Sequence, residues 1–270
     1  MDVAAGSSND PVDVAAGVLA ACRLEERLFD GFPDVLRPRS EEEAYAVQGR
    51  LHARLTSAGE GDLVGHKVGC TTAVMQQYLG IDSPCSGQLF SQRVFESEGT
   101  FPKRRSGRLG VECEVAVLLG SDISPRDDRF TRQDVGPAVA ACCAAIEVVE
   151  DRYVDYATLD TPTLIADDFF NLGAVLGPFV HGFDVEALPD VRASMSVDGI
   201  EVGRGLGTQV MGHPLDALAW LATSCSSRGI TLHAGEVVLL GSLVQTHWVT
   251  PGSTVAIVND QLGRAVAHLT

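Results

Sequence analysis

The chain has 270 residues, of which 45% are apolar and 21% charged, so it can bury one large core or two small ones. Disordered and fibrous proteins are thereby excluded. Twenty Lys and Arg residues against 36 Asp and Glu residues give a formal charge of −16, which argues against a protein that neutralises nucleic-acid phosphates or anionic lipid. We expect an acidic globular protein.

The first residues show no targeting signal. No basic region precedes the short apolar stretch Val14–Cys22, and no run reaches the roughly 18 apolar residues of a membrane span. We predict that residues 1–12 are disordered. The seven cysteines form no Cys-x-x-Cys pair and have no histidine at ligand spacing. We interpret them as reduced core residues of a cytoplasmic protein.

Helices are predicted in the first hundred residues. Ser40 followed by Glu43 is a capping-box pattern that opens a helix to about Ser57. Ala73–Leu79 is predicted as a short helix. The polar, turn-forming segment Gly99–Gly110 is the best candidate for a boundary, although we expect the residues on its two sides to act together.

The chain beyond residue 100 is predicted to be rich in strands. Val111–Leu119 alternates with period two, which predicts a strand. Thr131–Ala144 is predicted as a helix in which Pro137 causes a late start or a kink, and Ala145–Glu150 as a second strand. The remaining predicted elements are strands at Leu172–Val180, Ser194–Val202, Val237–Val244, Thr254–Val258 and Arg264–Leu269, and a helix from Pro214 to Arg228 closed by Gly229.

These elements predict an α+β protein. We expect one domain over residues 13–270, with a helical part at about 13–100 and a β-rich core at about 101–270.

The predicted strand at Val111–Leu119 carries two carboxylates on one face. Side chains alternate along a strand, so Glu112 and Glu114 project together with their Cα atoms roughly 6.5–7 Å apart. In one interpretation this face is solvated and both carboxylates are hydrated. In the other, Mg²⁺ or Mn²⁺ holds them together with a third acid from a neighbouring strand. Glu147 is the obvious third, because a carboxylate in so apolar a run needs a partner.

Lys67 stands between glycines in the segment Gly65-His-Lys-Val-Gly-Cys-Thr-Thr72. The order of residues does not match a phosphate-binding P-loop, because His66 separates glycine from lysine and no hydroxyl residue directly follows Lys67. Such a lysine is either a surface turn residue or a pocket residue. In a pocket, burial lowers the pKa of the amine and makes it a proton carrier or an anchor for a carboxylate.

Six motifs stand in order along the chain. They are Gly65-His-Lys-Val-Gly, Met75-Gln-Gln-Tyr-Leu-Gly-Ile81, Val111-Glu-Cys-Glu-Val-Ala116, Ala145-Ile-Glu-Val-Val149, Leu164-Ile-Ala-Asp167 and Gly212-His-Pro-Leu-Asp-Ala-Leu-Ala-Trp-Leu221. Together they resemble the 2-keto-4-pentenoate hydratase group and its sister 4-oxalocrotonate decarboxylases, which belong to the fumarylacetoacetate hydrolase superfamily. The resemblance runs from about residue 13 to the C-terminus.

This resemblance implies a fumarylacetoacetate hydrolase-type fold, with a β-rich mixed-sheet roll or barrel core in the C-terminal part, flanking helices and a helical N-terminal region. It implies a divalent cation, Mg²⁺ or Mn²⁺, on Glu112, Glu114 and Glu147, and a catalytic Lys67. Family members act on small enolisable 2-keto acids in the degradation of aromatic compounds. They are commonly homo-oligomers, from dimers to decamers. Because the chain is acidic and has no run long enough to span a membrane, neither nucleic acid nor a membrane is an expected partner.

Two departures from the family pattern bear on the reaction. In Pro84-Cys-Ser-Gly87, Cys85 stands where hydratases carry an Asp that is thought to assist proton transfer. A thiol has a far higher reference pKa than a carboxyl group, so this exchange weakens water addition and favours decarboxylation. In Ala166-Asp-Asp-Phe-Phe170, an extra acid and two aromatic residues replace small polar ones. Phe169 and Phe170 either pack in the core or shape an apolar end of the pocket.

Further candidates for substrate binding come from the same resemblance: Thr71, Thr72, Asp167 and Ser242. For the two threonines and the serine, an ordinary turn is an equal alternative. His213, which precedes the predicted helix at Pro214, is interpreted as a capping or packing residue rather than a base.

The leading hypothesis is a metal-dependent lyase that hydrates a 2-hydroxy-2,4-dienoate of the 2-keto-4-pentenoate type to a 4-hydroxy-2-keto acid. Decarboxylation of the 4-oxalocrotonate type is the alternative, since one electron sink serves both reactions. Hydrolysis of a C–C bond in a 1,3-diketone usually needs a His/Glu pair, which we do not find in the N-terminal half. A non-catalytic paralogue would bind metal and 2-keto acid without turnover.

Overall fold

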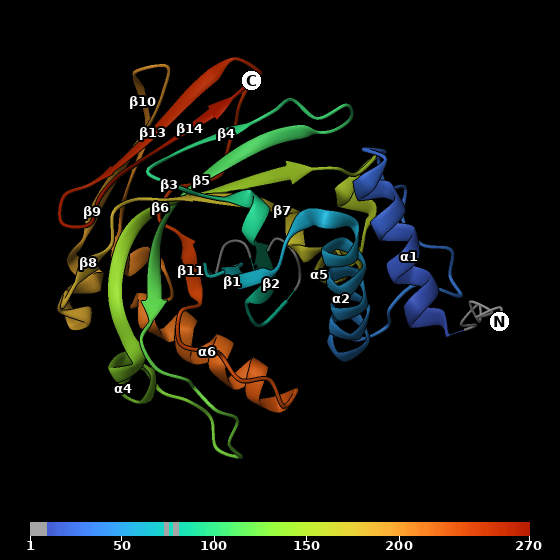
Figure 1. Cartoon of the computed structure of the whole chain (residues 1–270), viewed down its shortest axis with the longest axis horizontal. Helices are drawn as coiled ribbons and strands as arrows, with labels where there is room; N and C mark the ends of the chain where they lie inside the picture. Colours follow the sequence, from blue (N-terminus) through green and yellow to red (C-terminus); the bar gives the residue numbers. More distant parts are fainter. Residues whose placement is uncertain (1–9, 73–75, 78–80) are drawn as a thin grey trace.

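A computed structural model describes residues 10–72, 76–77 and 81–270 of the chain. Its centre is a nine-stranded mixed sheet in the order β2-β1-β11-β5-β6-β7-β3, in which β12 also pairs with β5 and β8 with β6 (Figure 1). The strands of this sheet are β1 (Leu63–Gly69), β2 (Cys85–Phe90), β3 (Val94–Glu96), β5 (Arg108–Leu119), β6 (Val139–Asp151), β7 (Asn171–Leu176), β8 (Val180–His181), β11 (Val237–Ser242) and β12 (His247–Trp248).

A second, five-stranded sheet has the order β10-β9-β13-β14-β4. Its strands are β4 (Glu98–Phe101), β9 (Arg192–Val197), β10 (Ile200–Leu206), β13 (Ser253–Asn259) and β14 (Gly263–Leu269). Three of the strand pairs are parallel, β1 with β11, β3 with β7 and β4 with β14. Within the described residues neither sheet closes into a barrel, which decides between the two predicted forms of the core.

The helices lie around the large sheet. Figure 1 shows α1 and α2 side by side at one end of the molecule, with α5 next to α2, and the five-stranded sheet at the other end. The helices are α1 (Pro11–Leu24), α2 (Glu41–Leu55), α4 (Arg132–Val135), α5 (Thr161–Ala166) and α6 (Pro214–Ser227), with short helical turns at Thr56–Glu60, Ser91–Arg93, Gly136–Ala138, Tyr156–Thr158, Asp168–Phe170, Val185–Asp190 and Gly207–Gln209. No helix in the described ranges is long and apolar enough to cross a membrane.

The N-terminal helix begins earlier than predicted. The side chain of Asp10 accepts a hydrogen bond from the Val12 amide at 3.1 Å, and Pro11 occupies the first turn. The prediction of disorder is therefore wrong for residues 10–12, and residues 1–9 lie outside the described part. At the start of α2 the prediction is confirmed, because Ser40 Oγ accepts from the Glu43 amide at 3.2 Å.

The part of the chain at 13–100 is less helical than predicted. Strands β1, β2 and β3 belong to the large sheet and β4 to the second sheet. Their sequences are short, three of the four contain a glycine, and they lack the period-two alternation that identifies strands. Of the helix predicted at Ala73–Leu79, only Gln76 and Gln77 are described. The segment Gly99–Gly110 contacts the N-terminal part of the chain. The Arg105 amide donates to the carboxylate of Glu26, just after α1, at 2.7 Å.

The prediction of a helix over Thr131–Ala144 is wrong beyond Val135. Helix α4 ends there, the Gly136–Ala138 turn that contains Pro137 follows, and β6 begins at Val139. The alanines and cysteines of this stretch are small enough for a strand that is buried on both faces, so their low strand propensity is overridden by tertiary packing.

The large sheet is buried on both faces. One face packs against α6 and the five-stranded sheet. The other holds a smaller cluster of mostly small side chains, including Ala116, Ala145 and Ala174. Helices α1, α2 and α5 form a third cluster with Cys70 and Cys85. The candidate site lies where the small-residue face meets this N-terminal layer.

Candidate active site

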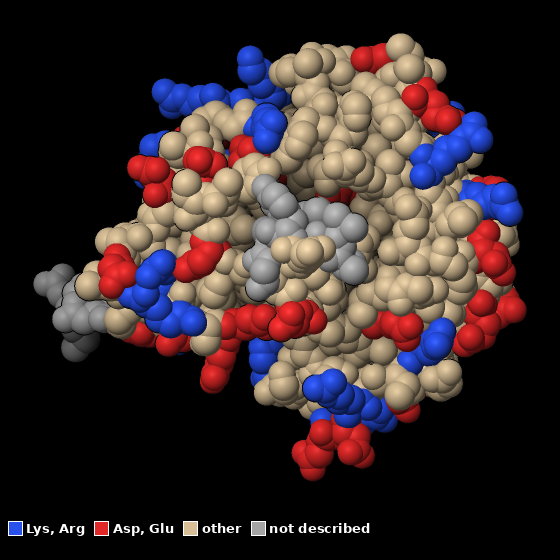
Figure 2. Space-filling model, turned by 180° about the vertical axis from the view of Figure 1, so that it is seen from behind, with Lys and Arg blue, Asp and Glu red and all other residues tan. Residues whose placement is uncertain are grey.

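Three glutamates converge on the small-residue face of the large sheet. Antiparallel pairing of β5 with β6 sets Glu112 directly opposite Glu147 and Glu114 opposite Ala145. Ligand atoms of the three carboxylates lie within 4.8 Å of one another. Glu114 and Glu147 are 1% and 0% exposed, and Glu112 is half-buried. Figure 2 shows a hollow on the back of the molecule in which acidic side-chain atoms are visible.

Each carboxylate has one fixed oxygen. The Gly241 amide donates to Glu114 Oε2 at 2.9 Å, Asn171 Nδ2 donates to Glu147 Oε1 at 2.8 Å, and the Thr246 hydroxyl donates to Glu112 Oε1. The other oxygens of the two buried glutamates, Glu114 Oε1 and Glu147 Oε2, have no hydrogen-bond partner among the described residues. Buried oxygens that are left over in this way fit a cation with oxygen ligands.

Gly241 is required at the site for a steric reason. Its φ is +117°, and a Cβ at this position would lie 2.3 Å from Thr71 Oγ1. The glycine thus lets the β11 backbone approach both Thr71 and Glu114. Thr71 itself is 5% exposed, and its contact with substrate stays a prediction.

The electrostatics of the three glutamates call for a cation. Burial raises the pKa of Glu112 to about 7, and the charge of Glu147 adds to the effect. Burial also raises the pKa of Glu114 well above its ordinary value, reinforced by Glu147 and Glu112. One ammonium group, on Lys67, faces three carboxylates. A divalent cation together with Lys67 would balance their three negative charges, so the residues fit such a cation.

Lys67 lies beside the glutamates, 2% exposed. Its Nζ donates to the Phe169 carbonyl at 2.7 Å and is 3.4 Å from Glu147 Oε1. The prediction that burial lowers its pKa is wrong for the chain without a cation. Burial alone acts in that direction, but Glu147 and Glu112 outweigh it and raise the pKa above the ordinary lysine value. The ammonium form is therefore held in place.

Phe169 and Phe170 both pack in the core, and Phe169 also borders the site. Phe169 is a buried member of the third cluster, and its ring centroid lies 5.3 Å from Lys67 Nζ. Phe170 is half-buried and packs against this cluster, edge-on to Tyr153 and Tyr156 with ring centroids 5.0 and 5.4 Å apart.

Three consecutive residues before β7 have left-handed backbone angles. The φ values of Asp168, Phe169 and Phe170 are +58°, +49° and +68°. Left-handed angles are unfavourable for aromatic residues and persist only where the surroundings enforce them. We refer to Asp168–Phe170 as the triplet.

Cys85 lies next to the lysine strand. It stands opposite Gly69 in the β1–β2 pair, two positions from the Lys67 pairing. Its thiol is completely buried and hydrogen-bonded to Cys70. Burial and Cys70 raise the pKa of the Cys85 thiol well above its ordinary value, so it stays neutral.

Three other residues are predicted to bind substrate, and that role stays a prediction for them. Asp167 is 1% exposed, with Oδ1 2.6 Å from Arg23 and Oδ2 3.2 Å from Arg152. Both of its oxygens are thus paired within the protein, which supports a structural role in place of substrate binding. The Ser242 hydroxyl donates to the Val244 carbonyl at 2.6 Å. Thr72 is half-buried in a turn.

His213 confirms its predicted role as a cap. It precedes α6, and its Nδ1 accepts from the Leu215 amide at 3.1 Å.

Sequence reasoning missed several residues that fix the site. Asn171 and Thr246 hold Glu147 and Glu112, and His52 binds Asp168. A polar amide at the start of the apolar run Leu172–Val180 was the available signal for Asn171. Thr246 and His52 show no local pattern, because their partners are far away in the chain.

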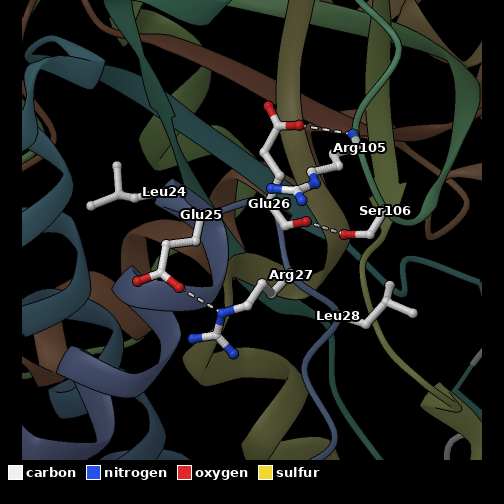
Figure 3. Close-up of a pocket in the computed structure, with 7 residues that line it drawn as sticks. All are labelled: Leu24, Glu25, Glu26, Arg27, Leu28, Arg105 and Ser106. Carbon is white, nitrogen blue, oxygen red and sulfur yellow. Dashed lines mark hydrogen bonds and ion pairs between the residues drawn. The ribbon is translucent and has the colours of Figure 1, made fainter.

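Another hollow lies at the end of α1 (Figure 3). It is lined by Leu24, Glu25, Glu26, Arg27, Leu28, Arg105 and Ser106. Both of its glutamates are paired, with Arg27 Nε 2.6 Å from Glu25 Oε2 and Arg104 Nη1 3.0 Å from Glu26 Oε1. None of the predicted site residues lies in it. The contacts of its lining residues join the end of α1 to the segment before β5.

Comparison with known proteins places the chain in a family. The model of the fumarylacetoacetate (FAA) hydrolase C-terminal family matches residues 91–270. A 2-keto-4-pentenoate hydratase of Paraburkholderia xenovorans is 35% identical over 228 residues, which cover 83% of this chain and 81% of the relative. A 2-hydroxyhexa-2,4-dienoate hydratase of Comamonas testosteroni is 30% identical over 260 residues, or 93% of each chain. The chain therefore belongs to the FAA hydrolase family.

A solved structure has the same fold. The 4-oxalocrotonate decarboxylase from Pseudomonas putida G7, complexed with magnesium and adipate, matches with a TM-score of 0.88 at 23% identity, over 95% of this chain and 96% of that one. The predicted resemblance and the predicted fold type are thus confirmed.

Proposed function

We propose that the protein is a divalent-metal-dependent lyase that hydrates a 2-hydroxy-2,4-dienoate of the 2-keto-4-pentenoate type to a 4-hydroxy-2-keto acid. One observation carries this proposal: a buried lysine lies 3.4 Å from a cluster of three carboxylates that lacks a balancing charge. Relatives named as hydratases, which match most of the chain, support the choice of reaction.

The three carboxylates of Glu112, Glu114 and Glu147 are the proposed ligands of Mg²⁺ or Mn²⁺. When bound, the cation supplies positive charge to an anionic 2-keto acid and makes its enol form accessible. Asn171, Thr246 and the Gly241 amide orient these carboxylates, because each fixes one oxygen and leaves the other free to face the cation.

Lys67 is the proposed proton carrier. Its Nζ holds a proton between the Phe169 carbonyl and Glu147 Oε1, in a buried position where bulk water does not compete. From this position the ammonium group gives a proton to the bound acid, and it also attracts the carboxylate of the acid.

Decarboxylation of the 4-oxalocrotonate type is the second candidate, and Cys85 favours it. A buried thiol whose pKa is raised does not replace the acid that assists water addition in hydratases. Loss of CO₂ needs no such acid, since the electron pair passes directly into the same enol system.

The proposal includes the setting in which the protein works. All seven cysteines lie in the described part of the chain, and all are free and buried, which supports a reducing compartment such as the cytoplasm. The family resemblance supports a homo-oligomer. Light scattering on the purified protein would measure its mass, and a monomer would contradict this part of the proposal.

The deciding experiment follows the mass of the product. Purified protein with Mg²⁺ or Mn²⁺ is incubated with 2-hydroxypenta-2,4-dienoate and, separately, with 4-oxalocrotonate. Gain of one water from the first supports the hydratase, and loss of CO₂ from the second supports the decarboxylase. In a third incubation, fragmentation of a 1,3-diketone acid would indicate a hydrolase. Binding of the acids without any turnover would contradict the lyase proposal.

A matched set of variants tests the metal ligands. Glu112→Gln combined with Glu114→Gln is expected to abolish the response to added metal. Glu98→Gln, which changes an exposed glutamate of β4, is the control. Activity with an unchanged metal response in the double variant would contradict the assignment.

A further inference from the structure

We propose that Arg23 and His52 are positioning residues for Lys67. They fix the carboxylate of Asp168, and thereby hold the left-handed triplet that sets the Phe169 carbonyl against Lys67 Nζ. The catalytic meaning of this inference rests on the proposed function.

The side chain of Asp168 is held from three directions. His52 Nε2 lies 2.6 Å from its Oδ1, Arg23 Nη1 lies 3.1 Å from its Oδ2, and the Gln88 amide donates to Oδ1 at 3.2 Å. Asp168 is 1% and His52 3% exposed. Charge-assisted contacts of this kind, made away from water, fix a side chain more firmly than surface contacts.

The backbone around the triplet is held as well. Arg23 Nη2 donates to the Asp167 carbonyl at 2.5 Å, and Arg152 Nη2 donates to the Phe170 carbonyl at 2.9 Å. Arginine side chains therefore donate hydrogen bonds to the backbone carbonyls immediately before the triplet and at its last residue. This explains how residues without a glycine keep left-handed angles in succession.

The triplet and the residue after it contact the proposed site residues at two points. The Phe169 carbonyl accepts from Lys67 Nζ at 2.7 Å, and the next residue after the triplet, Asn171, donates to Glu147 at 2.8 Å. A shift of the triplet would move both contacts together. Small displacements of a catalytic group reduce the reaction rate strongly. The contacts of Arg23 and His52 with Asp168 therefore affect the rate through the position of Lys67.

The two positioning residues belong to the N-terminal layer. Arg23 lies in α1 and His52 in α2, outside the region 91–270 that the family model matches. Asp168 is the extra acid that departs from the small polar pattern of the family, and it is the residue that both side chains bind. Among the contacts of this layer, Arg23 and His52 thus meet on one carboxylate next to the site, while Arg23 also binds Asp167.

The first test measures the NMR signal of the Lys67 side chain and does not require enzymatic activity. The chain has two lysines, Lys67 and the exposed Lys103, so protein labelled with ¹³Cε-lysine gives two side-chain NMR signals, and Lys103→Arg assigns them. We expect His52→Leu and Arg23→Gln each to move the Lys67 signal toward that of the exposed lysine. His52→Gln should keep it, because an amide can still donate to Asp168.

The control for this test breaks a different contact between the same helices. Arg54 of α2 pairs with Asp13 of α1 at 2.8 Å, and Arg54→Gln should leave the Lys67 signal in place. Circular dichroism and thermal unfolding verify the fold of each variant. Asp168→Asn serves where His52→Leu or Arg23→Gln does not fold, since asparagine also tolerates left-handed angles.

The second test reads turnover. His52→Leu should lower kcat by about tenfold or more with little change in metal affinity, and His52→Gln should restore most of it. An unmoved Lys67 signal in folded His52→Leu and Arg23→Gln protein would overturn the inference, whatever the turnover. A moved signal in a protein without turnover on any dienoate would instead support the positioning role and refute the proposed function.

Discussion

Lys67 Nζ lies 3.4 Å from Glu147 Oε1, and the two side chains are 2% and 0% exposed. Neither charge has access to bulk water, so each depends on the other for compensation. Removing one partner of a buried ion pair leaves the other uncompensated and is costly. This pair links the proposed metal ligands on β5 and β6 to the proposed proton carrier on β1.

Lys67→Met should reduce turnover by about 10²–10⁴-fold, because it removes the group that holds the proton. Binding of Mn²⁺, measured by titration calorimetry, should persist. Lys103→Met, which changes the other lysine of the chain, is the matched control. Turnover that survives in Lys67→Met would refute the role of Lys67 as the proton carrier.

Glu114→Gln should have opposite effects with and without metal. It removes one of three crowded negative charges, and glutamine can still accept from the Gly241 amide, so the cation-free protein should unfold at a higher temperature. The increase in melting temperature on adding Mn²⁺ should disappear, because a ligand is lost. A variant that is stabilised by Mn²⁺ as strongly as the wild type would show that Glu114 is not a ligand.

The stability of the cation-free protein should fall as the pH rises from about 4.5 to about 7. Because the pKa of Glu112 is about 7 against an ordinary 4.5, the folded chain binds this proton more tightly than the unfolded chain does. The stabilisation is complete below the unfolded pKa and is lost as the pH passes the folded one, by up to about 3 kcal/mol. Urea unfolding with a chelator measures it, and Glu112→Gln should flatten the slope. A slope that rises with pH in this window would contradict the prediction.

Cys85→Asp should raise the rate of water addition relative to loss of CO₂. The new carboxyl group would stand on β2 beside Lys67, where hydratases that resemble this chain carry an acid. Product masses from the two substrates measure the ratio, with Cys113→Ser, at a buried cysteine on the far face of β5, as the control. An unchanged ratio would mean that Cys85 does not occupy the position of the missing acid, or that water addition is not the reaction.

Gly241→Ala should destabilise the protein by about 2 kcal/mol or more, because an alanine Cβ would lie 2.3 Å from Thr71 Oγ1 at a φ of +117°. The approach of the backbone to Glu114 would also be lost, so metal affinity should fall. Thermal unfolding and Mn²⁺ titration check both effects. Gly182→Ala tests a glycine that also has a positive φ but open surroundings, and should leave metal binding intact.

Much of the site could be predicted from local patterns. Glu112 and Glu114 follow from the alternation of one strand, and Glu147 from the unlikelihood of an isolated acid in an apolar run. The sequence could not reveal that Glu112 and Glu147 are opposite each other, because strand register depends on the whole ladder. Nor could it reveal the direction of the Lys67 pKa, which depends on how many carboxylates surround the amine after folding.

The errors in the fold have a common physical cause. At Val139–Ala144 the small residues suggested a helix, yet burial on both faces of a sheet decides their conformation. The strands of the first hundred residues are short, and most of them contain a glycine, so no periodicity identified them. In both places the local preference is weak, and contacts with distant segments determine the structure.

The long ladder between β5 and β6 has a consequence for how the site can change. The strands pair from Arg108 with Asp151 to Leu119 with Val139, and a slip of one residue would turn the glutamates of β5 away from Glu147. The many apolar pairs on either side oppose such a slip. The ladder as a whole therefore sets the register that places Glu112 opposite Glu147, and an exchange of the acidic side chains would leave the same two strands in place.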